Sequence, residues 1–339
     1  MTRRTVRLSD VADAAGTSAK TVSRVVNGDH RVSIETRKRV QDEVDRLGYR
    51  VDLMARSLRK GVDDTVGVVV PTIGDPFFAT MVEEIEGIAL EQNLEVFIAR
   101  GSRSLGIEQR VIERMLARRV AGLIIAPFMT DFTFLANRNT PVVFLDRHAS
   151  GLDSDVVLVD DFAESKKVVH HLASYGHTRI ALIVDNLDVE TSRKRRDGYL
   201  AAHRELGLPI DESLEFRECI NAEVAEARTW EILALPETPT AIFSTRSETS
   251  LGVVRAQHHG NRTDIAMVSF GDFEAADILT PAITALDHNP RILARIAMER
   301  LVVLMRGDEM CVPSETIVPL HLIERGSGEI TPSTVAVSA

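Results

Sequence analysis

The segment from Leu8 to Asn27 reads LSDVADAAGTSAKTVSRVVN and decides the fold of the N-terminal region. Apolar residues at helical spacing continue as far as Gly16, which is a natural helix end. Ser18 is a suitable N-cap for a second helix over residues 19–26. Two small helices joined by a short glycine-containing turn are typical of a helix-turn-helix, so we predict one here.

The second predicted helix has an apolar side and a polar, basic side. The polar side suits the DNA major groove, where Arg24 can donate two hydrogen bonds to guanine and Lys20 can donate one. Ala19 is small enough to contact a thymine methyl group. The alternative is a solvated basic face that binds no partner. Contacts to the DNA backbone, which position a protein without reading sequence, are expected from Leu8, Ser18, Thr21, Ser23, Asn27, Arg31, Ser33 and Thr36.

Two further helices and a charge asymmetry complete the N-terminal region. Ser33 caps a third predicted helix that ends at Gly48, and Asp52 begins a fourth that reaches Leu58. Residues 1–60 hold 14 Lys and Arg against 8 Asp and Glu, a net charge of +6, whereas the whole chain has a net charge of −10. A basic end on an acidic body is typical of a nucleic-acid-binding module.

From residue 65 onward, strand patterns alternate with helical patterns in two series. This alternation predicts parallel sheets covered by helices on both faces, arranged as two lobes. A last helix, at 290–305, is expected to return the chain to the first lobe. The predicted strands are 66–70, 95–98, 122–125, 142–145, 156–159, 180–184, 241–244 and 265–270, and the helices between them are 78–92, 107–118, 162–175, 193–206, 223–235 and 248–259.

Composition argues against several classes of protein. No apolar run reaches the length of a membrane span, and no apolar segment follows the basic N-terminus, so we expect a cytoplasmic protein. The two cysteines, Cys219 and Cys311, lack the paired spacing of a zinc site. The motifs GxSxG, HExxH and GxxxxGK[ST] are absent from the sequence. We therefore predict no enzyme activity, no metal and no cofactor.

The motifs of the chain follow one another in the order and spacing of a known protein family. They cover about residues 7–323, and on them the chain resembles the LacI/GalR family of transcriptional regulators. The matching stretches are Leu8–Gly16, Ser18–Asn27, Val32–Val40, Leu47–Tyr49 and Ala55–Leu58 near the N-terminus, and Val66–Pro71, Asp75–Phe78, Phe144–Arg147, Gly176–His177 and Pro281–Thr284 in the body.

The resemblance implies an α/β fold class with four parts. An N-terminal helix-turn-helix DNA-binding domain occupies residues 1–50, and a hinge helix and linker occupy 51–62. A two-lobed, periplasmic-binding-protein-like α/β body for effector binding and dimerisation spans 63–325, and 326–339 form a flexible tail.

The resemblance also implies a function. The chain is expected to be a homodimeric repressor that binds double-stranded operator DNA under the control of a small carbohydrate-like effector. Base reading is assigned to Ala19, Lys20 and Arg24, and insertion into the minor groove to Leu58 with Ala55 beside it. An activator of the same family, or a cytoplasmic sugar-binding protein without DNA function, are the alternatives. The effector and the direction of its control stay open.

Ligands of open α/β sheets bind beyond the carboxyl ends of the strands. Arg195 matches the arginine with which relatives hold effector oxygens. Phe78 is either a cleft residue or the first core residue of its helix, and Asp146 is either a ligand contact or a residue that caps or bridges locally. The effector-binding residues expected from the rule and the resemblance are Asp75, Phe77, Phe78, Asp146, Asp160, Thr191, Arg195, Arg246, Asp272 and His288.

Two departures from the family pattern bear on the effector. Arg246 stands where relatives often carry Asn or Asp, and Gly271 stands where they commonly carry a ligand-binding Asp. Both exchanges make the cleft more cationic, which favours an anionic group such as a sugar acid or sugar phosphate over a neutral sugar or nucleoside. Alternatively, Arg246 pairs with Glu248 or another acid and does not meet the effector.

Overall fold

A computed structural model of the chain describes residues 6–26, 29, 31–49, 64–102, 106–307 and 312–332. The chain divides into two compact units, Met1–Asp63 and Asp64–Ala339. The predicted hinge helix, with Ala55 and Leu58, lies outside the described residues, as does Asn27.

The first unit is built from three short helices, α1 (Leu8–Ala14), α2 (Ala19–Val26) and α3 (Ile34–Leu47), as the sequence predicts. The caps are those expected, because Ser18 Oγ accepts from the Thr21 N–H at 3.1 Å and Ser33 Oγ accepts from the Thr36 N–H at 3.3 Å. Small apolar side chains on the inner faces of the helices make one core: Val11, Ala12, Ala15, Val22, Val25 and Val40.

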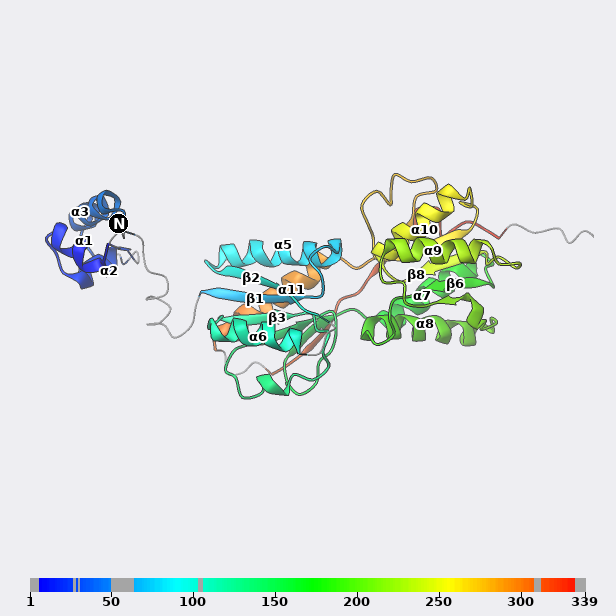
Figure 1. The fold of residues 1–339 in the computed structure, drawn as a ribbon, viewed down its shortest axis with the longest axis horizontal. Helices are drawn as coiled ribbons and strands as arrows, with labels where there is room; N and C mark the ends of the chain where they lie inside the picture. Colours follow the sequence, from blue (N-terminus) through cyan, green and yellow to red (C-terminus); the bar gives the residue numbers. More distant parts are fainter. Residues whose placement is uncertain are drawn as a thin grey trace, which may run out of the picture. The chain divides into compact units, whose positions relative to one another are not determined.

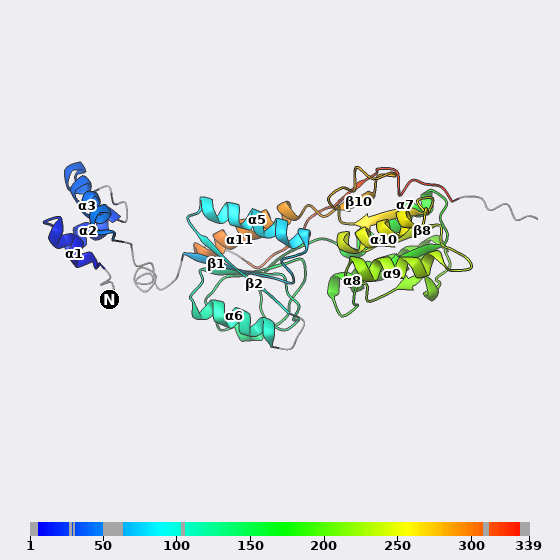
Figure 2. The ribbon, with the colours of Figure 1, turned by 45° about the horizontal axis from the view of Figure 1, so that its top comes forward.

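The second unit contains two parallel-stranded lobes, each with helices on both faces of its sheet (Figures 1 and 2). The sheet of the first lobe has the strand order β11-β5-β4-β3-β1-β2, and all its strands are parallel. Helices α5 and α11 pack on each other over one face, and α6 covers the other face. The elements are β1 (Thr65–Val70), α5 (Pro76–Glu91), β2 (Glu95–Arg100), α6 (Ile107–Ala117), β3 (Gly122–Ile125), β4 (Val142–Leu145), β5 (Asp155–Leu158), α11 (Pro290–Met305) and β11 (Glu315–Ile317).

The sheet of the second lobe has the strand order β12-β10-β9-β8-β6-β7, and only β12 runs antiparallel to its neighbour among the described strands. Helices α7 and α8 pack together on one face, and α9 and α10 on the other (Figure 1). The elements are α7 (Asp161–Ser174), β6 (Ile180–Ile183), α8 (Glu190–Leu206), β7 (Glu215–Phe216), α9 (Ala222–Leu233), β8 (Ala241–Ser244), α10 (Ser247–His259), β9 (Ala266–Phe270), β10 (Thr284–Asp287) and β12 (His321–Ile323).

A glycine allows the close packing of α7 against α8. A Cβ atom at Gly198 in α8 would lie 2.3 Å from the carbonyl oxygen of Phe162 in α7. No side chain fits at that distance, so the two helix backbones approach there only because residue 198 is glycine.

Two parts of the sequence prediction need correction or addition. The short strands β7, β10, β11 and β12 were not predicted. Residues 326–332 are not a flexible tail, because Ser327 is buried and its hydroxyl donates to the Met267 carbonyl at 2.7 Å. His177 on the same lobe has its Nε2 2.7 Å from the Ile330 carbonyl, so this segment is tied to the sheet. The expected return of 290–305 to the first lobe is confirmed, since α11 packs on α5 and β3–β5.

Candidate functional site

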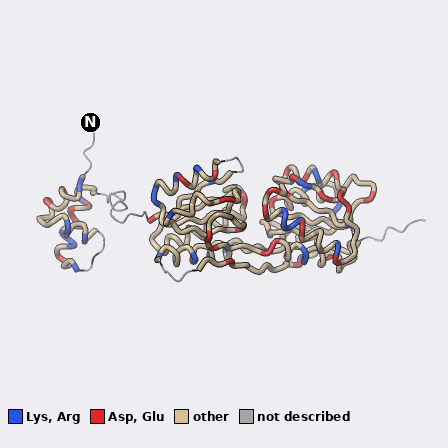
Figure 3. Tube along the Cα trace, turned by 90° about the horizontal axis from the view of Figure 1, so that it is seen from below, with Lys and Arg blue, Asp and Glu red and all other residues tan. Residues whose placement is uncertain are grey.

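The outer face of α2 is formed by residues that the sequence analysis proposed for base reading. Ala19, Lys20 and Arg24 are exposed, whereas Val22 and Val25 on the opposite side are buried. Figure 3 shows basic and acidic residues in the N-terminal unit and in both lobes of the second unit. Within α2, however, the charged residues are Lys20 and Arg24, so the exposed face of this helix is cationic and lies on an apolar core.

Asp29 anchors two arginines at one end of this surface. Its carboxylate accepts from Arg31 Nε and Nη2, each at 2.9 Å, and lies 3.7 Å from Arg24 Nε. The hydrogen bonds from Arg31 lower the pKa of Asp29 to about 2. Arg31, which we expected at a phosphate, is thus an ion-paired side chain in the free protein, and it would exchange this carboxylate for a phosphate on DNA.

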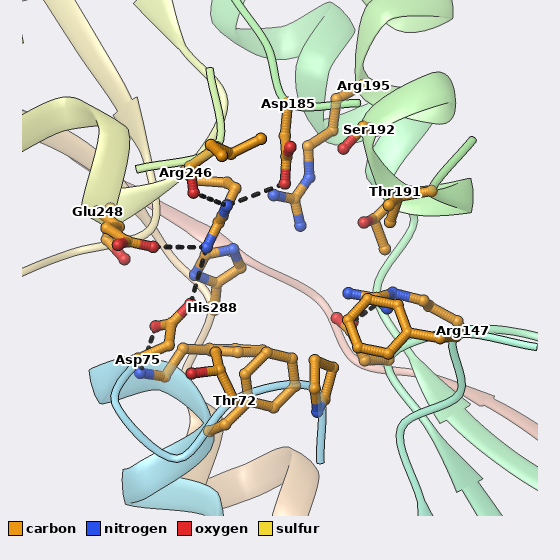
Figure 4. Close-up of a pocket in the computed structure, with 18 of the residues that line it drawn as sticks. Thr72, Asp75, Arg147, Asp185, Thr191, Ser192, Arg195, Arg246, Glu248 and His288 are labelled. Carbon is orange, nitrogen blue, oxygen red and sulfur yellow. Dashed lines mark hydrogen bonds and ion pairs between the residues drawn. The ribbon is translucent and has the colours of Figure 1, made fainter. Parts of the chain in front are cut away.

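The second unit holds a cavity of about 430 Å³ at the carboxyl ends of strands from both sheets (Figure 4). The first lobe contributes residues at or after the ends of β1, β2, β3 and β4, and the second lobe contributes those after β6, β7 and β8, the first two turns of α8 and His288 after β10. The side chains that matter below are Asp75, Phe77, Phe78, Phe128, Asp146, Arg147, Asp185, Thr191, Ser192, Arg195, Arg246, Glu248 and His288.

All but two of the predicted effector residues line this cavity. The two that do not are Asp160 and Asp272, and the expectation that they face the cleft is not met. Asp160 is exposed and caps α7 by accepting from the Ala163 N–H at 2.9 Å. Asp272 accepts from Arg325 Nη1 and Nη2 at 2.7 and 2.6 Å, a partner 53 residues away in sequence. Phe78 lines the cavity and also belongs to the core, so both interpretations of it hold.

Arg195 is buried and held rigidly. Its Nε donates to Asp161 Oδ1 at 2.7 Å, its Nη1 donates to the Thr245 carbonyl at 2.6 Å, and its guanidinium lies 3.9 Å from the centre of the Phe270 ring. Burial raises the pKa of Asp161 to about 6 despite the attraction of Arg195. Asp161 was missed by the sequence analysis, which selected its neighbour at the strand end.

Arg246 bridges the two lobes within a cluster of carboxylates. Its Nη2 donates to Asp75 of the first lobe at 3.1 Å and to Glu248 at 2.7 Å, and its Nη1 donates to Asp185 at 2.9 Å (Figure 4). Burial alone would lower the pKa of Arg246, but the attraction of Asp185, Asp75 and Glu248 raises it. Arg246 thus pairs with acids, which confirms the first part of the alternative stated above, and the expected excess of positive charge is absent around it. It nevertheless lines the cavity.

Arg147 completes a set of paired charges. Its Nε lies 3.1 Å from Asp146 Oδ2, its Nη1 donates to the Pro127 carbonyl at 3.1 Å, and its guanidinium lies over the Phe128 ring at 5.4 Å. Arg195, which is buried, and Arg147 and Arg246, which are half-buried, are thus each matched by at least one carboxylate. Arg100, which is exposed, is the fourth arginine of the lining.

A second polar contact joins the lobes beside the cavity. The His148 N–H donates to Glu190 Oε2 at 2.8 Å, and its Nδ1 lies 2.7 Å from Glu190 Oε1. Burial would raise the pKa of Glu190, but hydrogen bonds from Lys194 and His148 outweigh it and lower the pKa to about 2. Glu190 therefore stays ionised, and the contact persists across the physiological pH range.

In the part of the chain that the structure describes, no group of three His, Cys, Asp or Glu is placed to hold a metal ion, and no helix is long and apolar enough to cross a membrane. Cys219 is buried, and burial raises the pKa of its thiol to about 12.

Comparison with known proteins matches both units. Residues 7–52 match the family described as bacterial regulatory proteins, lacI family, and residues 169–328 match a periplasmic binding protein-like domain. The ribose operon repressor of Escherichia coli strain K12 is 27% identical, over 94% of this chain and 99% of that protein. Catabolite control protein A of Priestia megaterium is 30% identical, over 94% and 98%. A lac repressor dimer bound to operator and the anti-inducer ONPF superposes with a TM-score of 0.84 at 26% identity, covering 96% of this chain and 99% of that one.

Proposed function

The chain belongs to the lacI family of bacterial regulatory proteins and is a DNA-binding transcriptional regulator, and from this premise we propose how its residues carry out that function. Two copies form a cytoplasmic dimer that binds a pseudopalindromic operator and acts as a repressor. Each N-terminal unit places α2 in the major groove, and the cavity of each second unit takes the effector.

Base reading is the task of three exposed side chains on α2. Arg24 donates two hydrogen bonds from its guanidinium group to a guanine, Lys20 donates to a neighbouring base, and Ala19 contacts a thymine methyl group. The hydroxyls of Ser18, Thr21, Ser23, Ser33 and Thr36 suit phosphate contacts, since Ser18 and Ser33 already sit at the N-termini of α2 and α3, where anions are stabilised. The roles of Leu58 and Ala55 in the minor groove remain predictions from the sequence.

The effector that fits the cavity is a neutral polyhydroxylated molecule, most simply a saccharide. The observation that carries this choice is that each buried or half-buried arginine of the lining is paired with a carboxylate. An anionic effector that took Arg246 from Asp75, Asp185 and Glu248 would separate three carboxylates from their cation, two of them buried, which is costly. Sugar hydroxyls both donate and accept, so they can bond to carboxylates and guanidinium groups without separating them.

The effector controls DNA binding by changing the relation of the two lobes. The contacts Arg246–Asp75 and His148–Glu190 cross between them, so a molecule bound in the cavity alters their geometry. The coupling free energy expected between effector and operator is about 1–3 kcal/mol, and it must be the same in both directions.

The experiment uses the full-length protein. Operator sequences are selected from a random duplex library, and affinity for the best one is measured by fluorescence anisotropy over a series of salt concentrations. Phosphate contacts predict a steep linear fall of log K with log salt, and a flat response contradicts them.

Effector class is then tested by calorimetry with matched probes. D-ribose, D-xylose, D-glucose and D-galactose are compared with D-gluconate, D-glucose 6-phosphate and D-ribose 5-phosphate. We expect a neutral sugar to bind and to change operator affinity. Binding of the charged probes alone would refute the neutral effector.

A further inference from the structure

Asp29 follows α2 and uses each of its polar groups to connect the residues around it. Its N–H donates to the Arg24 carbonyl at 2.9 Å, which satisfies one of the free carbonyl groups at the end of α2. Its own carbonyl accepts from Arg37 Nη2 of α3 at 2.8 Å. The carboxylate accepts from the Arg31 N–H at 3.0 Å and, through both oxygens, from the Arg31 guanidinium. Asp29 is therefore fixed relative to both helices.

The same carboxylate lies beside the side chain to which we assign base reading. Asp29 Oδ2 is 3.7 Å from Arg24 Nε, which is an ion-pair distance but too long for a hydrogen bond. Arg31 Nη2 donates to that same oxygen at 2.9 Å. The Arg24 side chain is 45% exposed and the Arg31 side chain 79%. Two arginines thus share one carboxylate oxygen, and the more exposed of them holds it in the free protein.

The Asp29 carboxylate can act on DNA binding in two opposite ways. Hydrogen bonds from Arg31 lower its pKa to about 2, so it is ionised and repels nearby phosphates whatever the DNA sequence. A carboxylate that accepts from the Nε of an arginine, however, fixes the plane of the guanidinium and leaves Nη1 and Nη2 to face guanine O6 and N7. The first effect weakens binding to all DNA, and the second strengthens binding only where a guanine is in place.

We propose that Asp29 is a positioning residue for base reading, and that binding of Arg31 to a DNA phosphate makes it available. On the operator, Arg31 leaves Asp29 for a phosphate, and the released carboxylate oxygen accepts from Arg24 Nε. Arg24 then presents Nη1 and Nη2 to guanine in a fixed plane. On other sequences the carboxylate still repels the DNA backbone, and no guanine contact offsets the repulsion. The inference rests on the proposed function, because it assigns a further residue to the same DNA-binding face.

The first test uses Asp29→Asn in the full-length protein. Asparagine keeps the Oδ1 atom that accepts from the Arg31 N–H, so the local turn is preserved while the charge is removed. Affinity is measured by fluorescence anisotropy on the selected operator, on operators changed at each base pair and on a scrambled duplex. At the base pair that Arg24→Ala relaxes, discrimination should fall at least about fivefold. Affinity for the scrambled duplex should rise, since a charge that repels phosphates is gone.

The matched control for the loss of charge is Glu43→Gln. Glu43 lies on α3 and pairs with Arg46 at 2.6 Å, so this variant removes an equal charge from the same unit without altering α2. It should preserve discrimination at every base pair. A second control combines Arg24→Ala with Asp29→Asn, and there the loss of the carboxylate should cause no further change in base preference, because the side chain that it positions is absent.

A second test addresses the exchange of Arg31 between Asp29 and a phosphate. Arg31→Gln should weaken binding to the operator and to the scrambled duplex by similar factors, with base preference retained. The slope of log K against log salt should fall in magnitude by about 1, as expected for the loss of one phosphate contact. An unchanged slope would show that Arg31 stays on Asp29 in the complex, and the exchange would then be wrong.

The outcomes separate the inference from the proposed function. If no operator is selected, or if Arg24→Ala relaxes no base pair, the proposed base reading fails and the inference fails with it. If Arg24→Ala relaxes one base pair but Asp29→Asn leaves discrimination there unchanged, the positioning role of Asp29 is wrong while the DNA-binding function stands. If Asp29→Asn weakens binding to all duplexes by the same factor, Asp29 acts only by maintaining the fold, and the positioning role is again wrong.

Discussion

Loss of the ion pairs around Arg246 should lower the free energy of unfolding by an amount that depends on how deeply the charges are buried. Arg246→Gln removes an ion-pair partner of Asp185 and the lobe-bridging partner of Asp75, and both of these carboxylates are buried. Removing one partner of a buried ion pair costs about 3–5 kcal/mol. Because the Arg246 side chain is 21% exposed and Glu248 34%, we take the lower end, about 3 kcal/mol. For a unit of this size that corresponds to a fall in thermal midpoint of roughly 6–12 °C.

The assay is calorimetric unfolding of the full-length protein beside a matched surface variant. Arg228→Gln removes an exposed ion pair with Glu231 at 2.9 Å, for which a loss of about 0.5 kcal/mol or less is expected. Adding Asp185→Asn to Arg246→Gln should recover part of the stability, since one of the carboxylates that have lost the arginine is removed. Protonation relieves a buried carboxylate that has lost its cation, so the deficit of the variant should shrink as the pH falls. A midpoint for Arg246→Gln equal to that of the surface variant would refute the reasoning.

Three further predictions follow from individual side chains. Arg24→Ala should cost about 1–3 kcal/mol on the selected operator and relax preference at one base pair, and an equal loss on all duplexes would make Arg24 a phosphate contact. Gly198→Ala should destabilise the second unit by about 1–3 kcal/mol, because the added Cβ clashes with α7. The control is Gly87→Ala on α5, where a Cβ meets nothing within 4 Å and the stability should stay the same or rise. Similar thermal midpoints for the two variants would contradict the close approach of α7 and α8. In a Cys311→Ser background, the thiol of Cys219 should react with Ellman's reagent only on unfolding, since burial raises its pKa to about 12, and rapid reaction of the native protein would contradict its burial.

Local signals made most of the fold predictable. The caps of α2 and α3 depend on one serine each, Ser18 and Ser33, and the buried strands are recognisable as short apolar runs. Strands β7, β11 and β12 are only two or three residues long, so no periodicity marks them, and their pairing is set by neighbours far away in sequence. The segment 326–332 has the composition of a tail, and it is ordered because distant groups, such as the Met267 carbonyl, accept its hydrogen bonds.

The strand-end rule located the cavity but could not decide between neighbouring residues. Asp160 and Asp161 are adjacent at one strand end, yet only Asp161 meets Arg195, because α7 begins between them and turns the two side chains apart. Asp272 pairs with Arg325 instead of facing the cavity. This pair could be predicted only by knowing the path of the chain 53 residues later. Asp185 directly follows a predicted strand, so the same rule offered a signal for it that the prediction did not use.

The two departures from the family pattern show why charge cannot be summed from single positions. In the sequence, Arg246 adds a positive charge and Gly271 stands in place of a negative one, and together they predict a cationic cleft. In the fold, Arg246 lies among Asp75, Asp185 and Glu248. The space beside Gly271 is filled by the ring of His288, which is neutral because burial lowers its pKa well below the usual value. At each of the two positions, side chains that are distant in sequence but adjacent in space determine the local charge. Such a cavity distinguishes ligands by the positions of their donors and acceptors rather than by their net charge, since an ion would have to break pairs that a hydroxyl leaves intact.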